Sequence, residues 1–208
     1  MPSPSLATDA WIISKRPPTE KFQPLIAFSA EHGRLAVYLR LQRKESASVV
    51  ALDLFDETAL TIESSNQGQS WFIKEARLLV RHSEIGRSYE ALRHASSFAA
   101  VVARNDVPEE GRSTVYTLLR NAFAAFSGPA RPDVVHFKSL YRFARDEGYA
   151  VRQQWLPTLP ADLQEKAGHL LHTPLGEITA TAADEATTAL LQQGLEDYLR
   201  AYTDVLID

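Results

Sequence analysis

Cysteine is absent from the 208 residues of this chain. Without thiols there can be no disulfide bond and no thiolate-ligated metal, and the composition suits a reducing compartment. No uncharged apolar stretch approaches the roughly 18 residues that a membrane span requires. The first ten residues also lack the basic start and apolar core of a secretory signal. The sequence therefore predicts a protein that does not enter a membrane.

The signatures of common enzymes are also missing. There is no Gly-x-Ser-x-Gly nucleophile elbow, no Walker-type lysine loop and no Gly-x-Gly-x-x-Gly dinucleotide fingerprint. Glu109-Glu110 and Asp146-Glu147 are adjacent carboxylates, but neighbours in sequence diverge by about 100° around a helix. That geometry suits helix termini better than a paired acid and base. We therefore expect a protein that is not an enzyme and that uses no cofactor.

Glu165, His169 and His172 are the best candidates for a metal site. Their spacing can place the side chains on one face of a helix, yet the sequence offers no second ligand cluster and no His-Glu-x-x-His pattern. Exposed histidines near a helix C-terminus, where positive charge is mildly favourable, explain the same residues. We expect no metal, and a metal-dependent hydrolase ranks third among the functions considered.

Charge is unevenly distributed along the chain, whose net charge is −4. Residues 1–82 contain ten Lys or Arg and nine Asp or Glu, and residues 83–159 contain ten and eight. Residues 160–208 contain two and nine, so the acidity is confined to the last quarter. The remainder is mildly basic, which neither indicates nor excludes a nucleic-acid partner.

The first part of the chain has the pattern of β-strands. Residues 34–42 alternate between apolar and polar types, the period of two of a half-buried strand. Gly33 can provide the turn before this strand. Pro17-Pro18 ends the first strand, because neither proline can donate a backbone hydrogen bond. The expected strands lie at about residues 10–16, 24–29, 34–42 and 58–63, and from residue 71. Five short strands with short turns predict a small OB-type barrel.

Helical periodicity replaces this alternation after about residue 84. Apolar stripes predict helices near residues 89–102, 115–126, 137–144, 163–171 and 191–206. Thr181 is the expected N-cap of the last helix, with Asp184 three residues on. The expected fold is therefore α+β: an N-terminal five-stranded OB-type β-barrel over residues 1–83, followed by a C-terminal all-helical domain over residues 84–208.

A site for single-stranded nucleic acid needs positive groups along the backbone and flat rings on which bases stack. Arg34, Tyr38 and Arg40 share one face of the third strand and supply both. A solvated strand face, on which Glu31 and Glu45 balance the charge, explains the same pattern. The other large aromatic residues of this region are expected in the barrel core: Trp11, Phe28, Trp71 and Phe72.

Two segments follow the pattern of a known family. Residues 10–44 run strand, Arg-Pro, Glu-Lys-Phe, strand, Glu-His-Gly-Arg-Leu, strand, with Glu20 after the first strand and a basic loop after the third. Residues 141–149, Tyr-Arg-Phe-Ala-Arg-Asp-Glu-Gly-Tyr, end an expected helix in Gly-Tyr. In these segments the chain resembles the RecO family of DNA repair and recombination mediators.

The resemblance implies a cytoplasmic, nucleoid-associated protein that binds single- and double-stranded DNA without sequence preference, mainly through phosphate contacts. Its implied partners are the acidic tail of single-stranded-DNA-binding protein and a RecR-like protein. The implied DNA contacts are Lys15, Arg16, Lys21, Arg34, Tyr38, Arg40, Arg43 and Lys44. Residues that could border a pocket for the tail are Lys138, Arg142 and Arg145. The alternative is a protein-interaction adaptor that keeps the OB-fold but has lost DNA binding.

Overall fold

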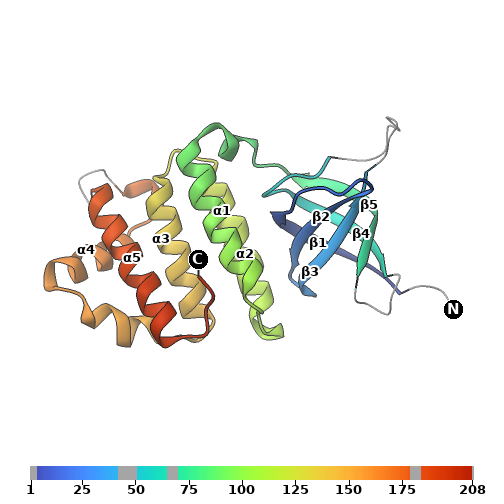
Figure 1. Cartoon of the computed structure of the whole chain (residues 1–208). Coiled ribbons are helices and arrows are strands. Elements are labelled where there is room, and N and C mark those ends of the chain that lie inside the picture. The colour runs from blue at the N-terminus through green and yellow to red at the C-terminus, as the bar shows by residue number, and fades with distance from the viewer. Residues whose placement is uncertain (1–3, 42–50, 65–69, 179–183, 208) are drawn as a thin grey trace. The chain divides into compact units, whose positions relative to one another are not determined.

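The computed structural model describes residues 4–41, 51–64, 70–178 and 184–207 and divides into two compact units (Figure 1). The first unit comprises Met1–His82 with Asp106–Thr117, and the second comprises Ser83–Asn105 with Leu118–Asp208. The α+β class expected from the sequence is confirmed. The sequence places one division at residue 83, whereas the structure also groups residues 106–117 with the strands. None of the helices described is long and apolar enough to cross a membrane.

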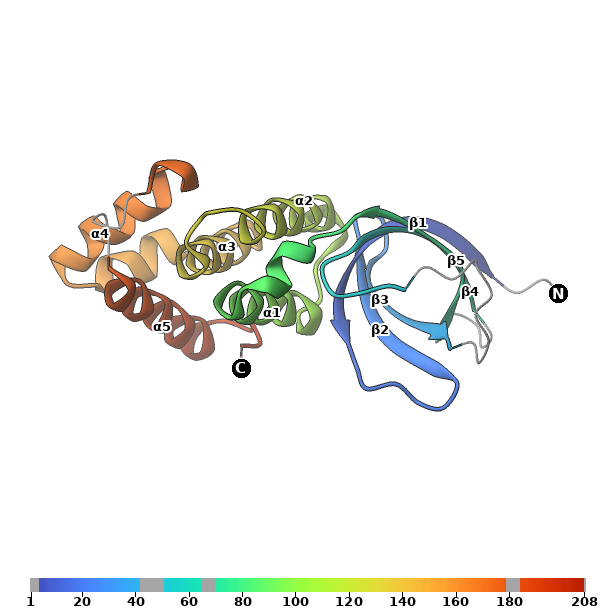
Figure 2. The same ribbon diagram turned by 90° about the horizontal axis from the view of Figure 1, so that it is seen from above.

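The sheet of the first unit closes on itself. Its strands are β1 (Ser5–Lys15), β2 (Phe22–Ser29), β3 (Gly33–Arg40), β4 (Glu57–Ser64) and β5 (Trp71–Val80). They pair in the order β1-β2-β3-β5-β4, and β4 pairs again with β1 (Figure 2). The ladder between β3 and β5 is parallel and the other ladders are antiparallel.

The alternation predicted for the third strand is confirmed as far as Arg40, where β3 ends, two residues before the expected end at residue 42. Leu35 and Val37 of β3 are buried in the core cluster inside the sheet, while Arg34 and Ala36 are exposed. Gly33 begins the strand with a φ of 64°, a backbone conformation that favours glycine. The hairpin between β2 and β3 therefore forms where the sequence places its turn.

Residues 106–117 cover one side of the sheet in the first unit. They include the start of α2 (Glu109–Phe126), where the Tyr116 hydroxyl donates to Glu57 Oε1 over 2.7 Å. The Tyr116 ring lies 6.1 Å from Trp11, and both side chains are buried. Trp11 and Phe28 are thus buried, as expected, but they lie outside the cluster that fills the sheet.

A buried carboxylate, that of Asp56, holds the segment just before β4 in place through hydrogen bonds. Asp56 is 1% exposed, and Arg81 binds both of its oxygens, with Nε at 3.0 Å from Oδ1 and Nη2 at 2.7 Å from Oδ2. The backbone N–H of Asp53 donates to Oδ2 over 2.8 Å. The hydrogen bond to Asp56 also raises the pKa of Arg81 above its usual value. The carboxylate of Asp56 is therefore buried together with the groups that donate hydrogen bonds to it.

The second unit consists of helices. It contains the second half of α2, while the first half of that helix belongs to the first unit. The other helices are η1 (Ser83–Arg87), α1 (Tyr89–Arg104), α3 (Pro132–Asp146), η2 (Val151–Trp155), η3 (Leu156–Thr158), α4 (Ala161–His172), η4 (Leu175–Glu177) and α5 (Glu185–Tyr202). Helix α3 packs against α1, α4 and α5, and every residue from Val134 to Tyr141 is buried. Asp184 caps α5 by accepting from Thr187 N over 2.7 Å, and Thr181, the expected cap, lies outside the described residues.

Two histidines meet in the core of the second unit. The Nδ1 atoms of His94 on α1 and His136 on α3 are 3.0 Å apart, so one must donate a proton and the other accept it. Arg93 Nη2 lies 2.8 Å from the Nε2 atom of His94. Burial lowers the pKa of His136 to about 3 and lowers the pKa of His94 as well. The pair is therefore neutral at neutral pH.

Candidate nucleic-acid interface and a pocket beside α3

Three aromatic rings gather on the outer face of β2, β3 and β5. Tyr38 stacks on Phe72 with ring centroids 5.5 Å apart and an interplanar angle of 29°. Phe22 approaches Tyr38 at 6.5 Å and Phe72 at 5.4 Å, in both cases edge-on. The parallel ladder pairs Tyr38 with Phe72, which brings two residues far apart in sequence together. All three rings are half-buried and present flat apolar surface to solvent. We call them the aromatic cluster.

Exposed cations lie at one end of the aromatic cluster. Arg40 is paired with Phe22 in the β2–β3 ladder, and Lys21 precedes Phe22 in the chain. The Lys21 carbonyl accepts from Leu41 N over 2.8 Å, which holds the two strand ends together. Arg16 is exposed just beyond β1. Among the described residues, Arg16, Lys21 and Arg40 make no ion pair, so their charges are available to a ligand.

Other basic residues expected in the interface are already paired. Lys15 forms an ion pair with Asp53 at 3.2 Å, and Arg34 forms one with Asp106 at 3.1 Å. Both pairs are largely exposed, so they are weak and open to competition. Arg43 and Lys44 lie outside the described residues. The expected set therefore divides into paired cations, unpaired cations and Tyr38.

Sequence reasoning missed two of the three rings. Phe72 was expected in the barrel core but lies on the outer face, because the next residue, Ile73, takes the inward position in β5. Phe22 was not considered as a contact. No pattern in the sequence marks Phe22 as outward-facing, because its polar neighbour Gln23 is the buried residue of the two.

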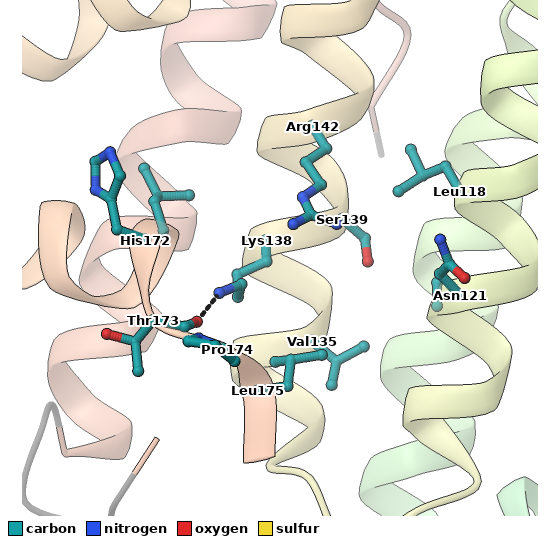
Figure 3. A pocket seen from close by; sticks show the side chains of 12 residues that line it. Leu118, Asn121, Val135, Lys138, Ser139, Arg142, His172, Thr173, Pro174 and Leu175 are labelled. Atoms are coloured by element: carbon teal, nitrogen blue, oxygen red, sulfur yellow. Dashed lines mark hydrogen bonds between the residues drawn. The ribbon is translucent and has the colours of Figure 1, made fainter. Parts of the chain in front are cut away.

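A pocket of about 300 Å³ lies beside α3 in the second unit (Figure 3). Lys138 lines it, but this side chain is buried and its Nζ donates to the carbonyls of Leu170 and Thr173, each over 2.6 Å. Those carbonyls belong to the C-terminal end of α4, so the ammonium caps that helix. Burial, with Arg142 nearby, lowers the pKa of Lys138 to about 8.

Arg142 is the exposed cation of the same pocket. It follows Lys138 by one helical turn, and none of the residues described forms an ion pair with it. Arg145 does not line the pocket and pairs instead with Asp146 at 2.6 Å. Val135, Leu171 and Leu175 contribute apolar walls. The pocket thus combines apolar surface with one available positive charge.

The histidines considered for metal binding are occupied locally. His172 Nδ1 lies 2.6 Å from the carbonyl of Gly168, and His169 Nδ1 lies 3.5 Å from the hydroxyl of Thr173. Within the described ranges, no three His, Asp or Glu side chains converge in a way that could hold a metal ion.

The aromatic cluster and the pocket beside α3 differ in the ligands they suit. The first offers stacking surfaces beside cations, and the second an apolar cavity with one cation at its edge. The sequence matches no family model and no curated protein.

Proposed function

We propose that this protein binds single-stranded DNA through the aromatic cluster and acts as a RecO-like recombination mediator. The observation that carries the proposal is the stacked pair of Tyr38 and Phe72 with Arg40 at its edge. Bases stack on such rings with about 1–3 kcal/mol each, while cations track the phosphates. Contacts of both kinds are independent of sequence, as a repair mediator requires.

The strand order supports the same proposal. An OB-fold is a five-stranded Greek-key barrel that binds oligonucleotides on the face of strands two and three. The order β1-β2-β3-β5-β4, with β4 returning to β1, suits that architecture, and Phe22 and Tyr38 lie on β2 and β3. We therefore infer an OB-type barrel. Double-stranded DNA and a RecR-like protein are further partners in this proposal.

Binding should depend on salt only moderately. Arg16, Lys21 and Arg40 are the available cations in this part of the first unit. Each phosphate contact with a single strand contributes about −0.7 to the slope of log affinity against log salt. Three contacts therefore give a slope of about −2.

Removing either stacking ring should weaken binding strongly. We expect Tyr38→Ala and Phe72→Ala each to lower the affinity for an oligothymidine of about 16 nucleotides by roughly tenfold, because one stacked base is lost. Fluorescence anisotropy of the labelled oligonucleotide measures this. Tyr38→Phe should retain binding, and Tyr89→Ala, a change at a 75% exposed ring on α1, is the control. Unchanged affinity in Tyr38→Ala would exclude the aromatic cluster.

A second pair of variants separates the available cation from the paired one. Arg40→Ala should flatten the salt slope by about 0.7, whereas Arg34→Ala should change it less, because Arg34 is already bound to Asp106. Titrations at several salt concentrations give both slopes. Equal effects of the two variants would mean that local ion pairing does not decide which cations contact DNA.

A second candidate function is a protein-interaction adaptor, and the pocket beside α3 favours it. Its apolar walls and Arg142 suit an acidic peptide that ends in a large apolar residue with a free carboxylate. The family resemblance implies such a ligand for this pocket, namely the acidic tail of single-stranded-DNA-binding protein. Lys138 would contribute through its position rather than its charge, because its protons are directed at α4.

Reversing the charge of Arg142 should weaken this binding. We expect Arg142→Glu to lower the affinity for an aspartate-rich peptide ending in Phe by at least about tenfold. The reason is the loss of a charge-assisted contact of roughly 1.5–3 kcal/mol. Calorimetric titration measures the affinity. Arg145→Glu is the matched control on the same helix, because Arg145 does not line the pocket. A similar loss in both variants would indicate general attraction to α3 and not the pocket.

A further inference from the structure

We infer that the groove between α5 and the η2–η3 segment binds a basic peptide segment of a partner protein, in which an arginine lies beside an apolar residue. The groove belongs to the second unit and has a volume of about 550 Å³. It shares no lining residue with the aromatic cluster or with the pocket beside α3. The inference therefore does not rest on the proposed function.

The floor of the groove is apolar. Trp155 is 2% exposed at its base, with Leu159 beside it. Gly194 of α5 faces both, and a Cβ there would meet nothing closer than 3.8 Å from Trp155 Nε1 and 3.9 Å from Leu159 Cδ2. The helix thus packs closely on Trp155 and Leu159 without a side chain of its own, and the groove above this point can take an apolar side chain of a ligand.

One edge of the groove is aromatic. Tyr198 and Tyr202 lie one turn apart on α5 with ring centroids 5.3 Å apart. The Tyr198 hydroxyl donates to Gln154 Oε1 over 2.8 Å, which fixes that ring across the groove. Tyr202 is 76% exposed, so its ring face is open to a ligand. Such a face attracts a guanidinium or an ammonium group.

The charge around the groove selects a cation. Asp197 lines it, and its Oδ1 atom accepts from Gln193 and from Arg200, each over 2.8 Å; the second contact is an exposed ion pair, which is weak and open to competition. Its Oδ2 atom accepts from no residue that the structure describes, so it can receive a donor from a ligand. Residues 160–208 carry two basic and nine acidic side chains. Asp197 at the groove, within this acidic part of the chain, favours a basic segment as the ligand.

Arginine suits these groups better than lysine. Its planar guanidinium can lie on the Tyr202 ring while its edge donates to Asp197, and a neighbouring leucine can pack against the partly exposed Leu159. Lysine offers a point charge without a stacking plane. The partner segment is therefore expected to contain Arg next to an aliphatic residue.

The test uses the full chain and a fluorescein-labelled peptide of alternating Leu and Arg. We expect the peptide to bind, and Tyr202→Ala and Asp197→Asn each to weaken it by about fivefold, because each removes one contact of roughly 1 kcal/mol. Leu190→Ala is the matched control, since Leu190 is 62% exposed on the same helix and does not line the groove. It should leave the affinity unchanged.

Three results would overturn the inference. The first is equal binding of the peptide with Glu in place of Arg, and the second is an equal loss in Leu190→Ala. The third is a dimer in sedimentation that Tyr202→Ala dissociates, which would assign the groove to a second copy of the chain. Binding of oligothymidine by the same variants tests the aromatic cluster separately. Failure of the peptide-binding inference can therefore be distinguished from failure of the proposed DNA binding.

Discussion

Replacing Arg81 with Met is expected to lower the free energy of unfolding by about 3 kcal/mol. The substitution leaves the carboxylate of Asp56, which is 1% exposed, without the guanidinium that binds both of its oxygens. Removing one partner of a buried ion pair typically costs 3–5 kcal/mol. The lower end applies because the Arg81 side chain is 41% exposed and water can partly replace it. Urea denaturation at neutral pH measures the loss.

Two further variants separate the charge from the geometry. Arg81→Lys keeps a positive charge without the two-pronged contact, so its stability should be intermediate. Combining Asp56→Asn with Arg81→Met removes both charges and should recover part of the loss. A double variant no more stable than Arg81→Met would show that the unpaired carboxylate is not the cause.

Acidification from pH 7 to pH 5 is expected to destabilise the protein by about 2 kcal/mol through His136 alone. Burial lowers the pKa of His136 to about 3, below the usual value of 6.5 that the unfolded chain has. The unfolded state therefore takes up a proton that the folded state refuses. The contribution of this group to stability is complete above pH 6.5 and is lost as the pH falls from 6.5 towards 3, by about 1.4 kcal/mol per pH unit.

Urea denaturation at pH 7, 6 and 5 measures this dependence. His136→Asn removes the titrating ring. The slope of the free energy of unfolding against pH should therefore be smaller by the amount that corresponds to one proton, about 1.4 kcal/mol per pH unit. His94 contributes in the same direction, because burial and Arg93 also lower its pKa. His172→Asn, at an exposed position of α4, is the control variant. If His136→Asn has the wild-type dependence, the proton is taken up elsewhere.

Local patterns in the sequence predicted most of the elements. The alternation around Leu35 and Val37 identified β3, and the stripe expected at residues 89–102 corresponds to α1. Both signals depend only on neighbours within the same element. The start of α2 was placed too late, at about residue 115 and not at Glu109, because the first residues of this helix are polar and carry no stripe.

The candidate sites were harder to predict because their contacts join distant residues. Lys15 and Asp53 are 38 positions apart, and Arg34 and Asp106 are 72 apart. No periodicity reports such pairs, so the paired and available cations could not be distinguished. The same is true of the stacking of Tyr38 on Phe72, which needs the parallel ladder between β3 and β5.

The discontinuous first unit has a consequence for synthesis on the ribosome. Its strands are complete at His82, but Tyr116, which packs on Trp11, is made only after residues 83–105 of the other unit. At roughly 5–20 residues per second, the nascent strands wait several seconds with Trp11 lacking this cover. During that interval they expose apolar surface of the kind that chaperones bind, and the order of translation thereby sets when the first unit can finish folding.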